Sequence, residues 1–130
     1  MLYALLAAAL VAADQLVKYL VRTYIPLGES IPFLPHIMDL TYVQNTGAAF
    51  SLFQEHTWIL TLVSLAASVA LAVILAGKRV TRHPLGRGLV AVVLAGAVGN
   101  LIDRALLGFV TDMFETTFIN FAVFNVADIC

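Results

Sequence analysis

The chain has 130 residues, of which 62% are hydrophobic and only 12% are charged, and its mean hydropathy is +0.97. A soluble domain averages about 45–50% apolar and about 25% charged residues, so this composition excludes an ordinary soluble globule and indicates a membrane protein. The net charge of -1, with no basic stripe, excludes a nucleic-acid partner, and the single cysteine, Cys130, excludes an internal disulfide.

The first apolar segment covers residues 2–24 and ends before Pro26. Its length matches the roughly 20 residues that a helix needs to cross the hydrocarbon core. Ala4, Ala8 and Ala12 recur every four residues, which predicts a small face that lets another helix approach closely.

The second half of this segment carries charges at the same spacing. Asp14, Lys18 and Arg22 follow one another every four residues, so they share one side of the predicted helix. Neighbours at this spacing can form ion pairs. We therefore expect a closely packed inner half and a charged outer half.

An irregular stretch follows from Pro26 to Thr57. Pro32 and Pro35 prevent a continuous helix there. Residues 39–43 are rich in β-branched and aromatic side chains, which predicts a short strand. A long connection without regular structure usually has a function. We expect a small β-element on the extracytoplasmic membrane surface.

An unbroken apolar run at residues 58–76 predicts the second span, and residues 85–102 predict the third. The loop between them, residues 77–88, contains most of the chain's cations, namely Lys78, Arg79, Arg82 and Arg87. The positive-inside rule makes this loop cytoplasmic. The N-terminus is then cytoplasmic, and residues 25–57 lie outside.

A fourth apolar segment begins near residue 122, and the sequence stops at Cys130. We expect residues 122–130 to be the start of a truncated fourth helix. The predicted fold class is an all-α membrane protein, a four-helix transmembrane bundle with a small extracytoplasmic β-element. We expect residues 1–130 to form a single domain, because no repeat or linker interrupts them.

This topology brings polar groups from distant segments to one depth, just below the extracytoplasmic surface. The groups expected there are Asp14, Lys18, Asn45, Asn100, Asp103 and Asp128. Charged side chains cost about 2.5–3.5 kcal/mol each at the bilayer centre on insertion scales, so such a cluster indicates function.

The chemistry open to this cluster is that of paired carboxylates. Asp103, Asp112 and Asp128 lie near one another in the sequence, while the histidines are scattered. Two aspartates that share a site do not easily both ionise, so one can accept a proton from water while the other hydrogen-bonds a scissile carbonyl. This is aspartic-protease chemistry, which needs neither metal nor cofactor. Spacing leaves open which aspartates pair, and Asn100 or Asn125 could orient them.

Purely structural roles are the alternative to catalysis for several of these residues. Asp14 with Lys18, and Asp103 with Arg104, could be neutral pairs that only fix helix packing. Asp112 could be an ordinary loop carboxylate.

The polar loop residues Asn45 and Gly47 are typical of a turn. Asp128, unpaired in an apolar segment, is hardest to explain by structure alone. A small proton- or cation-coupled transport subunit is the main functional alternative to a protease, and a membrane anchor for a partner leaves Asp128 unexplained.

Several blocks of the sequence, taken together and in order, resemble lipoprotein signal peptidase (signal peptidase II), the bacterial intramembrane aspartyl protease family. The blocks are Ala13-Asp14-Gln15 with Lys18, Asn45-Thr46-Gly47-Ala48-Ala49-Phe50, Gly99-Asn100-Leu101-Ile102-Asp103-Arg104, Val110-Thr111-Asp112, and Phe124-Asn125-Val126-Ala127-Asp128. One departure is Met113, where the family usually has Phe.

The resemblance implies cleavage of prolipoproteins just before a diacylglyceryl-modified cysteine, at the outer face of the bacterial cytoplasmic membrane. It implies a multi-pass protein that contacts membrane lipid, works without cofactor or metal, and is expected to be a monomer. The implied catalytic pair is Asp112 and Asp128. The residues expected to contact substrate or support the pair are Asn45, Gly47, Asn100, Arg104 and Asn125, and those expected to be structural are Asp14, Lys18 and Asp103.

Overall fold

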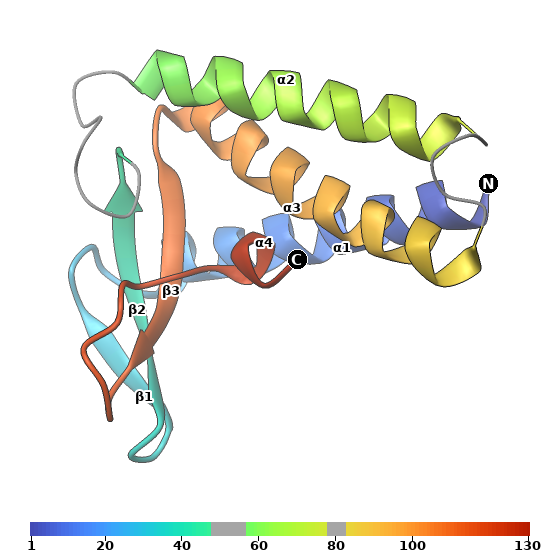
Figure 1. Ribbon diagram of the computed structural model, residues 1–130. Helices are drawn as coiled ribbons and strands as arrows, with labels where there is room; N and C mark the ends of the chain where they lie inside the picture. Colours follow the sequence, from blue (N-terminus) through green and yellow to red (C-terminus); the bar gives the residue numbers. More distant parts are fainter. Residues whose placement is uncertain (48–56, 78–82) are drawn as a thin grey trace.

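The computed structural model describes residues 1–47, 57–77 and 83–130. Three helices in these ranges are long and apolar enough to cross a membrane: α1 (Leu2–Tyr24), α2 (Thr57–Ala76) and α3 (Pro84–Leu107). Helix α3 packs against both α1 and α2, and a β-sheet stands across one end of the three helices (Figure 1). We call this end of the helices the sheet end. The expected cytoplasmic cations Lys78, Arg79 and Arg82, and residues 48–50 of the expected turn, lie outside the described residues.

The helix boundaries agree closely with the prediction. Helix α1 has the predicted bounds, and α2 begins one residue earlier than predicted. Helix α3 continues to Leu107 rather than ending at residue 102, and it ends at Gly108, whose φ of 79° is left-handed. A glycine adopts this conformation at a helix end without steric cost.

The buried face of α1 differs from the predicted one. Ala4, Ala8 and Ala12 are exposed, so they do not form the face of α1 that packs against the other described helices, and Ala8 and Ala12 instead line a groove between α1 and α3. The buried residues of α1 are Ala7, Asp14, Lys18 and Val21. The helix is rotated so that the charged pair points inward, which turns the alanine row away from the helix contact.

Helix α3 carries the small face that the sequence predicts. Ala91, Ala95 and Gly99 are all buried. Ala91 and Ala95 form an apolar core with Ala7 of α1 and Leu75 of α2. Small residues let helix backbones approach closely where lipid removes the hydrophobic drive for association.

The sheet has three strands, β1 (Ser30–Leu34), β2 (Met38–Asn45) and β3 (Val110–Thr116), all antiparallel in the order β1-β2-β3. The predicted strand at residues 39–43 is confirmed within β2. Strands β1 and β3 were not predicted, because their pairing with β2 depends on contacts that no local pattern encodes.

The sheet packs on α1 through its own apolar cluster. Met113 of β3 and Tyr42 of β2 are buried against Val21 and Ile25 at the end of α1. Met113 is fully buried, so the residue that departs from the family pattern belongs to the core.

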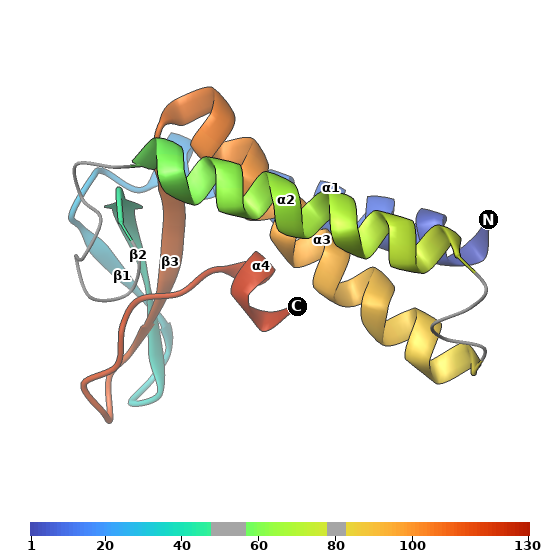
Figure 2. The same cartoon turned by 45° about the horizontal axis from the view of Figure 1, so that its top comes forward.

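The fourth apolar segment is only partly helical. Helix α4 comprises Val126–Ile129, and the segment before it crosses in front of the sheet (Figures 1 and 2). The expectation of a helix from residue 122 is wrong, because Phe124 pairs with Phe114 through backbone hydrogen bonds that need an extended chain. The described residues therefore contain three membrane-length helices rather than a bundle of four.

Candidate active site

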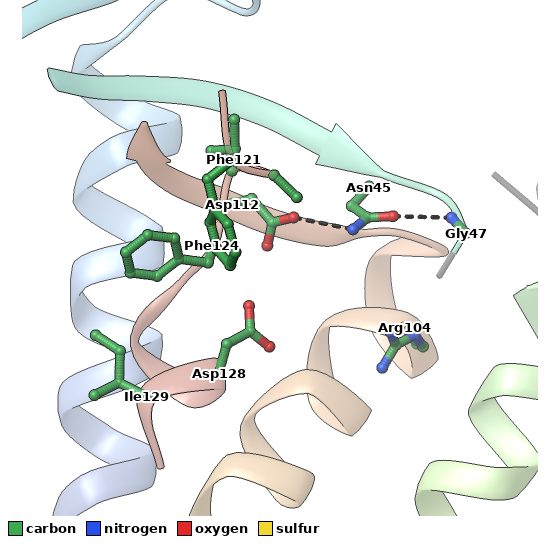
Figure 3. A pocket seen from close by; sticks show the side chains of 10 residues that line it. Asn45, Gly47, Arg104, Asp112, Phe121, Phe124, Asp128 and Ile129 are labelled. Atoms are coloured by element: carbon green, nitrogen blue, oxygen red, sulfur yellow. Dashed lines mark hydrogen bonds between the residues drawn. The ribbon is translucent and has the colours of Figure 1, made fainter. Parts of the chain in front are cut away.

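A cavity of about 570 Å³ opens at the sheet end, between the end of α3, strand β3 and helix α4. It is lined by Asn45, Gly47, Arg104, Asp112, Phe121, Ala122, Val123, Phe124, Asp128 and Ile129. The carboxyl groups of Asp112 and Asp128 point into the same space, with Arg104 across from them (Figure 3). Segments far apart in the sequence thus supply polar groups to one cavity.

Asp112 lies in strand β3 and its residue is only 3% exposed. The alternative that it is an ordinary loop carboxylate is therefore wrong. Its Oδ1 accepts a hydrogen bond of 2.7 Å from Asn125 Nδ2, and its Oδ2 accepts one of 3.0 Å from Asn45 Nδ2. Burial raises the pKa of Asp112, and the negative charge of Asp128 adds to this effect, while both amide hydrogen bonds oppose it.

Asn45 holds Asp112 because its own amide is fixed. The backbone N–H of Gly47 donates to Asn45 Oδ1 at 3.0 Å, so the Nδ2 group is left to face Asp112. The turn expected at Asn45 and Gly47 and the contact with the carboxylate are therefore parts of one arrangement.

Asp128 lies in the first turn of α4. Its Oδ1 accepts a hydrogen bond of 2.9 Å from Asn100 Nδ2, and its Oδ2 accepts one of 3.0 Å from the backbone N–H of Asn125. Asn125 Oδ1 in turn accepts the N–H of Asp128, which completes a capping box. This box explains why α4 begins at Val126.

Asn125 joins the two aspartates directly. Its side chain donates to Asp112, its backbone donates to Asp128, and the residue is fully buried. The two carboxyl groups are therefore held in a defined relation to each other.

A second polar cluster is buried beneath the cavity. Lys18 Nζ lies 3.0 Å from Asp14 Oδ2 and 3.4 Å from Asp103 Oδ2, and all three side chains are at most 2% exposed. The ion pair predicted between Asp14 and Lys18 is confirmed. This cluster lies at the contact between α1 and α3, where the sequence predicts that their polar residues meet.

The alternative pair between Asp103 and Arg104 is wrong. Asp103 faces Lys18 and also Arg22. Arg22 Nη1 lies 3.8 Å from Asp103 Oδ1. Adjacent helix residues do not face each other, so Arg104 points away and donates from Nη1 to Ser64 Oγ of α2 at 3.3 Å.

The buried cluster also holds the chain segments that lead to the two aspartates. Asp14 Oδ1 accepts the backbone N–H of Ala127 at 2.9 Å, next to Asp128. Asp103 Oδ2 accepts the backbone N–H of Thr111 at 2.9 Å, next to Asp112. The expected convergence of Asp14, Lys18, Asn100, Asp103 and Asp128 is thus found as one connected network.

Sequence reasoning missed some members of this network. Gln15 donates to Asp14, to the carbonyl of Gly99 and to Asp103, each at 3.1 Å. Its place beside Asp14 on a lipid-spanning helix is the signal that could have found it. Thr111 gave no such signal, because its role depends on the backbone.

Comparison with known proteins identifies the family. Residues 6–130 match the family model described as Signal peptidase (SPase) II. The chain belongs to the signal peptidase II family. It is therefore a membrane protease that removes signal peptides, as the resemblance of its sequence blocks implied.

Similar proteins support this membership. The chain is 42% identical to the lipoprotein signal peptidase of Brevibacillus brevis, over 98% of the chain and 85% of that protein. It is also 42% identical to the lipoprotein signal peptidase of Enterococcus faecalis, over 97% of the chain and 78% of that protein. A bacterial membrane enzyme solved by the in meso method at 2.3 Å superposes with a TM-score of 0.88, at 30% identity, over 97% of this chain and 77% of that one.

Proposed function

We propose that this signal peptidase II is an aspartic endopeptidase that cleaves diacylglyceryl-modified prolipoproteins just before the lipidated cysteine, with Asp112 and Asp128 as its catalytic pair. The observation that carries the proposal is that both carboxyl groups face one cavity and are joined through Asn125. Neither a metal nor a cofactor takes part in this reaction.

The surroundings of the two carboxyl groups support different roles for them. Asp112 has a pKa raised by burial, so it holds the shared proton and donates a hydrogen bond to the scissile carbonyl oxygen. Asp128 faces the same cavity, and its carboxyl group is held in place by N–H groups from Asn100 and from the backbone of Asn125. Asp128 is then the base that takes a proton from water.

The reaction proceeds through a tetrahedral intermediate. Water oxygen bonds to the carbonyl carbon as its proton passes to Asp128 and the proton of Asp112 moves to the carbonyl oxygen. The C–N bond then breaks as Asp128 returns a proton to the leaving nitrogen, and Asp112 regains its own. Arg104 and Asn45 line the same cavity and are suited to hold substrate backbone.

The apolar wall of the cavity suits a lipidated substrate. Phe121, Phe124 and Ile129 line one side of it. Phe121 and Ile129 are among the exposed large apolar residues, so this wall is open to the surroundings of the protein. We assign it to the apolar part of the substrate next to the cleavage site.

The proposed topology places the N-terminus in the cytoplasm and the sheet end outside, since residues 77–88 hold most of the cations. The chain acts as a single domain, residues 1–130, and as a monomer in the bacterial cytoplasmic membrane. A groove of about 390 Å³ between α1 and α3 is lined almost entirely by apolar residues. A fourth helix in this groove would complete a four-helix bundle.

A transport subunit fits less well. The core at the end of the helices away from the sheet consists of Ala7, Leu75, Ala91 and Ala95. A relay for protons or cations needs polar groups through both halves of the membrane. The ionisable cluster of the described residues lies at the sheet end instead.

Asparagine substitution of either aspartate tests the proposed reaction. Asp112→Asn and Asp128→Asn should each lower cleavage of a diacylglyceryl-modified prolipoprotein by about 10²–10⁴-fold, because each removes one acid–base group. Mass spectrometry of the released signal peptide measures this, with the protein purified in detergent. Asp39→Asn is the matched control, since Asp39 lies on the same sheet and does not line the cavity. Cleavage at the normal rate by Asp128→Asn would contradict the proposal.

A further inference from the structure

Lys18 is fully buried, and each of its ammonium hydrogens has a different acceptor. Besides Asp14 and Asp103, Lys18 Nζ donates to Asn100 Oδ1 at 2.9 Å. An ammonium group has donors only, so it can bind nothing but the oxygen of an amide. Lys18 therefore selects which end of the Asn100 side chain it faces.

This selection fixes the contact that Asn100 makes on its other side. With Oδ1 held by Lys18, the Nδ2 group faces Asp128 Oδ1 at 2.9 Å. A reversed amide would set its NH₂ group against the ammonium and its oxygen against a carboxylate, and both contacts are repulsive. The buried ammonium group of Lys18 thus sets the orientation of the Asn100 amide, and this orientation directs the amide N–H at Asp128.

Lys18 also neutralises the carboxylates that anchor the chain near both aspartates. Asp14 holds the N–H of Ala127, and Asp103 holds the N–H of Thr111. These anchors are structural, whereas the contact with Asn100 leads to the carboxyl group itself. The two effects of Lys18 can therefore be separated by experiment.

We infer that Lys18 is a positioning residue for peptide cleavage, which acts by orienting the Asn100 amide so that its N–H group is directed at Asp128. This inference rests on the proposed function, because it takes Asp128 as the base. Family resemblance assigned Lys18 a structural role only, and a structural role alone predicts no link between Lys18 and Asn100 in kcat.

A double-mutant cycle between Lys18 and Asn100 tests the inference. Lys18→Met by itself leaves two buried carboxylates with less compensation, so it is always combined with Asp14→Asn, whereas the parent and the Asn100→Ala variant keep Asp14 and Lys18. In the combined variant Arg22 still neutralises Asp103, and the asparagine oxygen can still accept the N–H of Ala127. The cluster therefore stays balanced in charge after Lys18 is removed.

Lys18→Met should lower kcat by roughly 10- to 100-fold while KM changes by less than about twofold, because a hydrogen bond to a charged group is misdirected and the substrate cavity is untouched. In the presence of Asn100→Ala, Lys18→Met should change kcat by less than about twofold, since its route to Asp128 is already removed.

Gln15→Leu is the matched control for this cycle. Gln15 contacts the same carboxylates as Lys18 but does not contact Asn100. Its effect on kcat should be equal with Asn100 and with Asn100→Ala. An equal effect of Lys18→Met in the two cases would overturn the inference, while cleavage that persists in Asp112→Asn or Asp128→Asn would overturn the proposed catalytic pair instead.

Discussion

The helices contact one another through different kinds of side chain at the two ends of the helical body. At the end away from the sheet, α1 and α3 meet through Ala7, Ala91 and Ala95. At the sheet end, the same two helices meet through the buried ions Asp14, Lys18 and Asp103. The first contact depends on close backbone approach, and the second on charge and hydrogen-bond direction.

This difference separates the stability of the helix packing from the positioning of the two aspartates. A buried ion pair often stabilises a fold no more than apolar residues of the same volume would, because the ions lose their hydration. Its advantage is direction, since each oxygen and each hydrogen of the cluster has a specific partner. The apolar end therefore holds the helices together, and the polar end fixes where Asp112 and Asp128 lie.

Gly99→Ala should break the polar end most severely. A Cβ at this position would lie 2.6 Å from Asp14 Oδ2 and 3.2 Å from the Cβ of Ala127. We expect a loss of stability of about 1–3 kcal/mol, as in other overpacked sites, together with at least a tenfold loss of cleavage. Thermal unfolding in detergent and the cleavage assay measure the two effects.

The matched control is Gly88→Ala, in the same helix but near its other end. A Cβ at Gly88 meets nothing within 4 Å. Replacing a helical glycine by alanine should therefore raise stability by about 0.5–1 kcal/mol without loss of activity. Equal behaviour of the two variants would remove the contrast between the ends.

Ala91→Leu should break the apolar end without touching the chemistry. Ala91 is fully buried in the core of α1, α2 and α3, so added methylenes should cost about 1–3 kcal/mol of stability. Below its melting temperature the variant should keep the kcat of the parent. A fall in kcat larger than about threefold in the folded protein would show that the apolar end also sets the geometry of the site.

The smallest expected effect is a pH dependence of stability at the polar end. The pKa of Asp112 is raised by burial, so the folded state binds a proton more readily than the unfolded state. Its stabilising contribution is present below the ordinary aspartate pKa of about 3.9 and is lost as the pH rises through the raised value. The melting temperature of the parent minus that of Asp112→Asn should therefore decrease from pH 4 upward, and an increase would contradict the assignment of the shared proton.

Local pattern was sufficient for the helices but not for the sheet. Length and hydropathy placed α1 and α2 to within one residue, because lipid requires a long apolar run. Strand β3 escaped prediction because its partner β2 is distant in the sequence. The extended chain at Phe124, fixed by pairing with Phe114, likewise defeated the prediction of a helix from residue 122.

For the site, the level of the polar residues along the helices could be predicted from the sequence, but the rotation of α1 about its axis could not. Topology placed Asp14, Asn100 and Asp103 at a common level, which the structure confirms. The partner of Asp103 depends on how α1 turns about its own axis, and the alanine row suggested the wrong rotation. The choice of Asp112 and Asp128 as the catalytic pair came from family resemblance and stays a prediction of role, which the asparagine variants test.

Asn125 sets the distance between the two carboxyl groups of the site. One residue contacts Asp112 with its side chain and Asp128 with its backbone, so the separation of the two carboxyl groups is set locally. Asp128 is also bonded to Asn100, and Ala127 to Asp14, so the pair is attached to α3 and α1 as one unit. Asn125 thus sets the distance between the two carboxyl groups, and the two helices set where the pair lies.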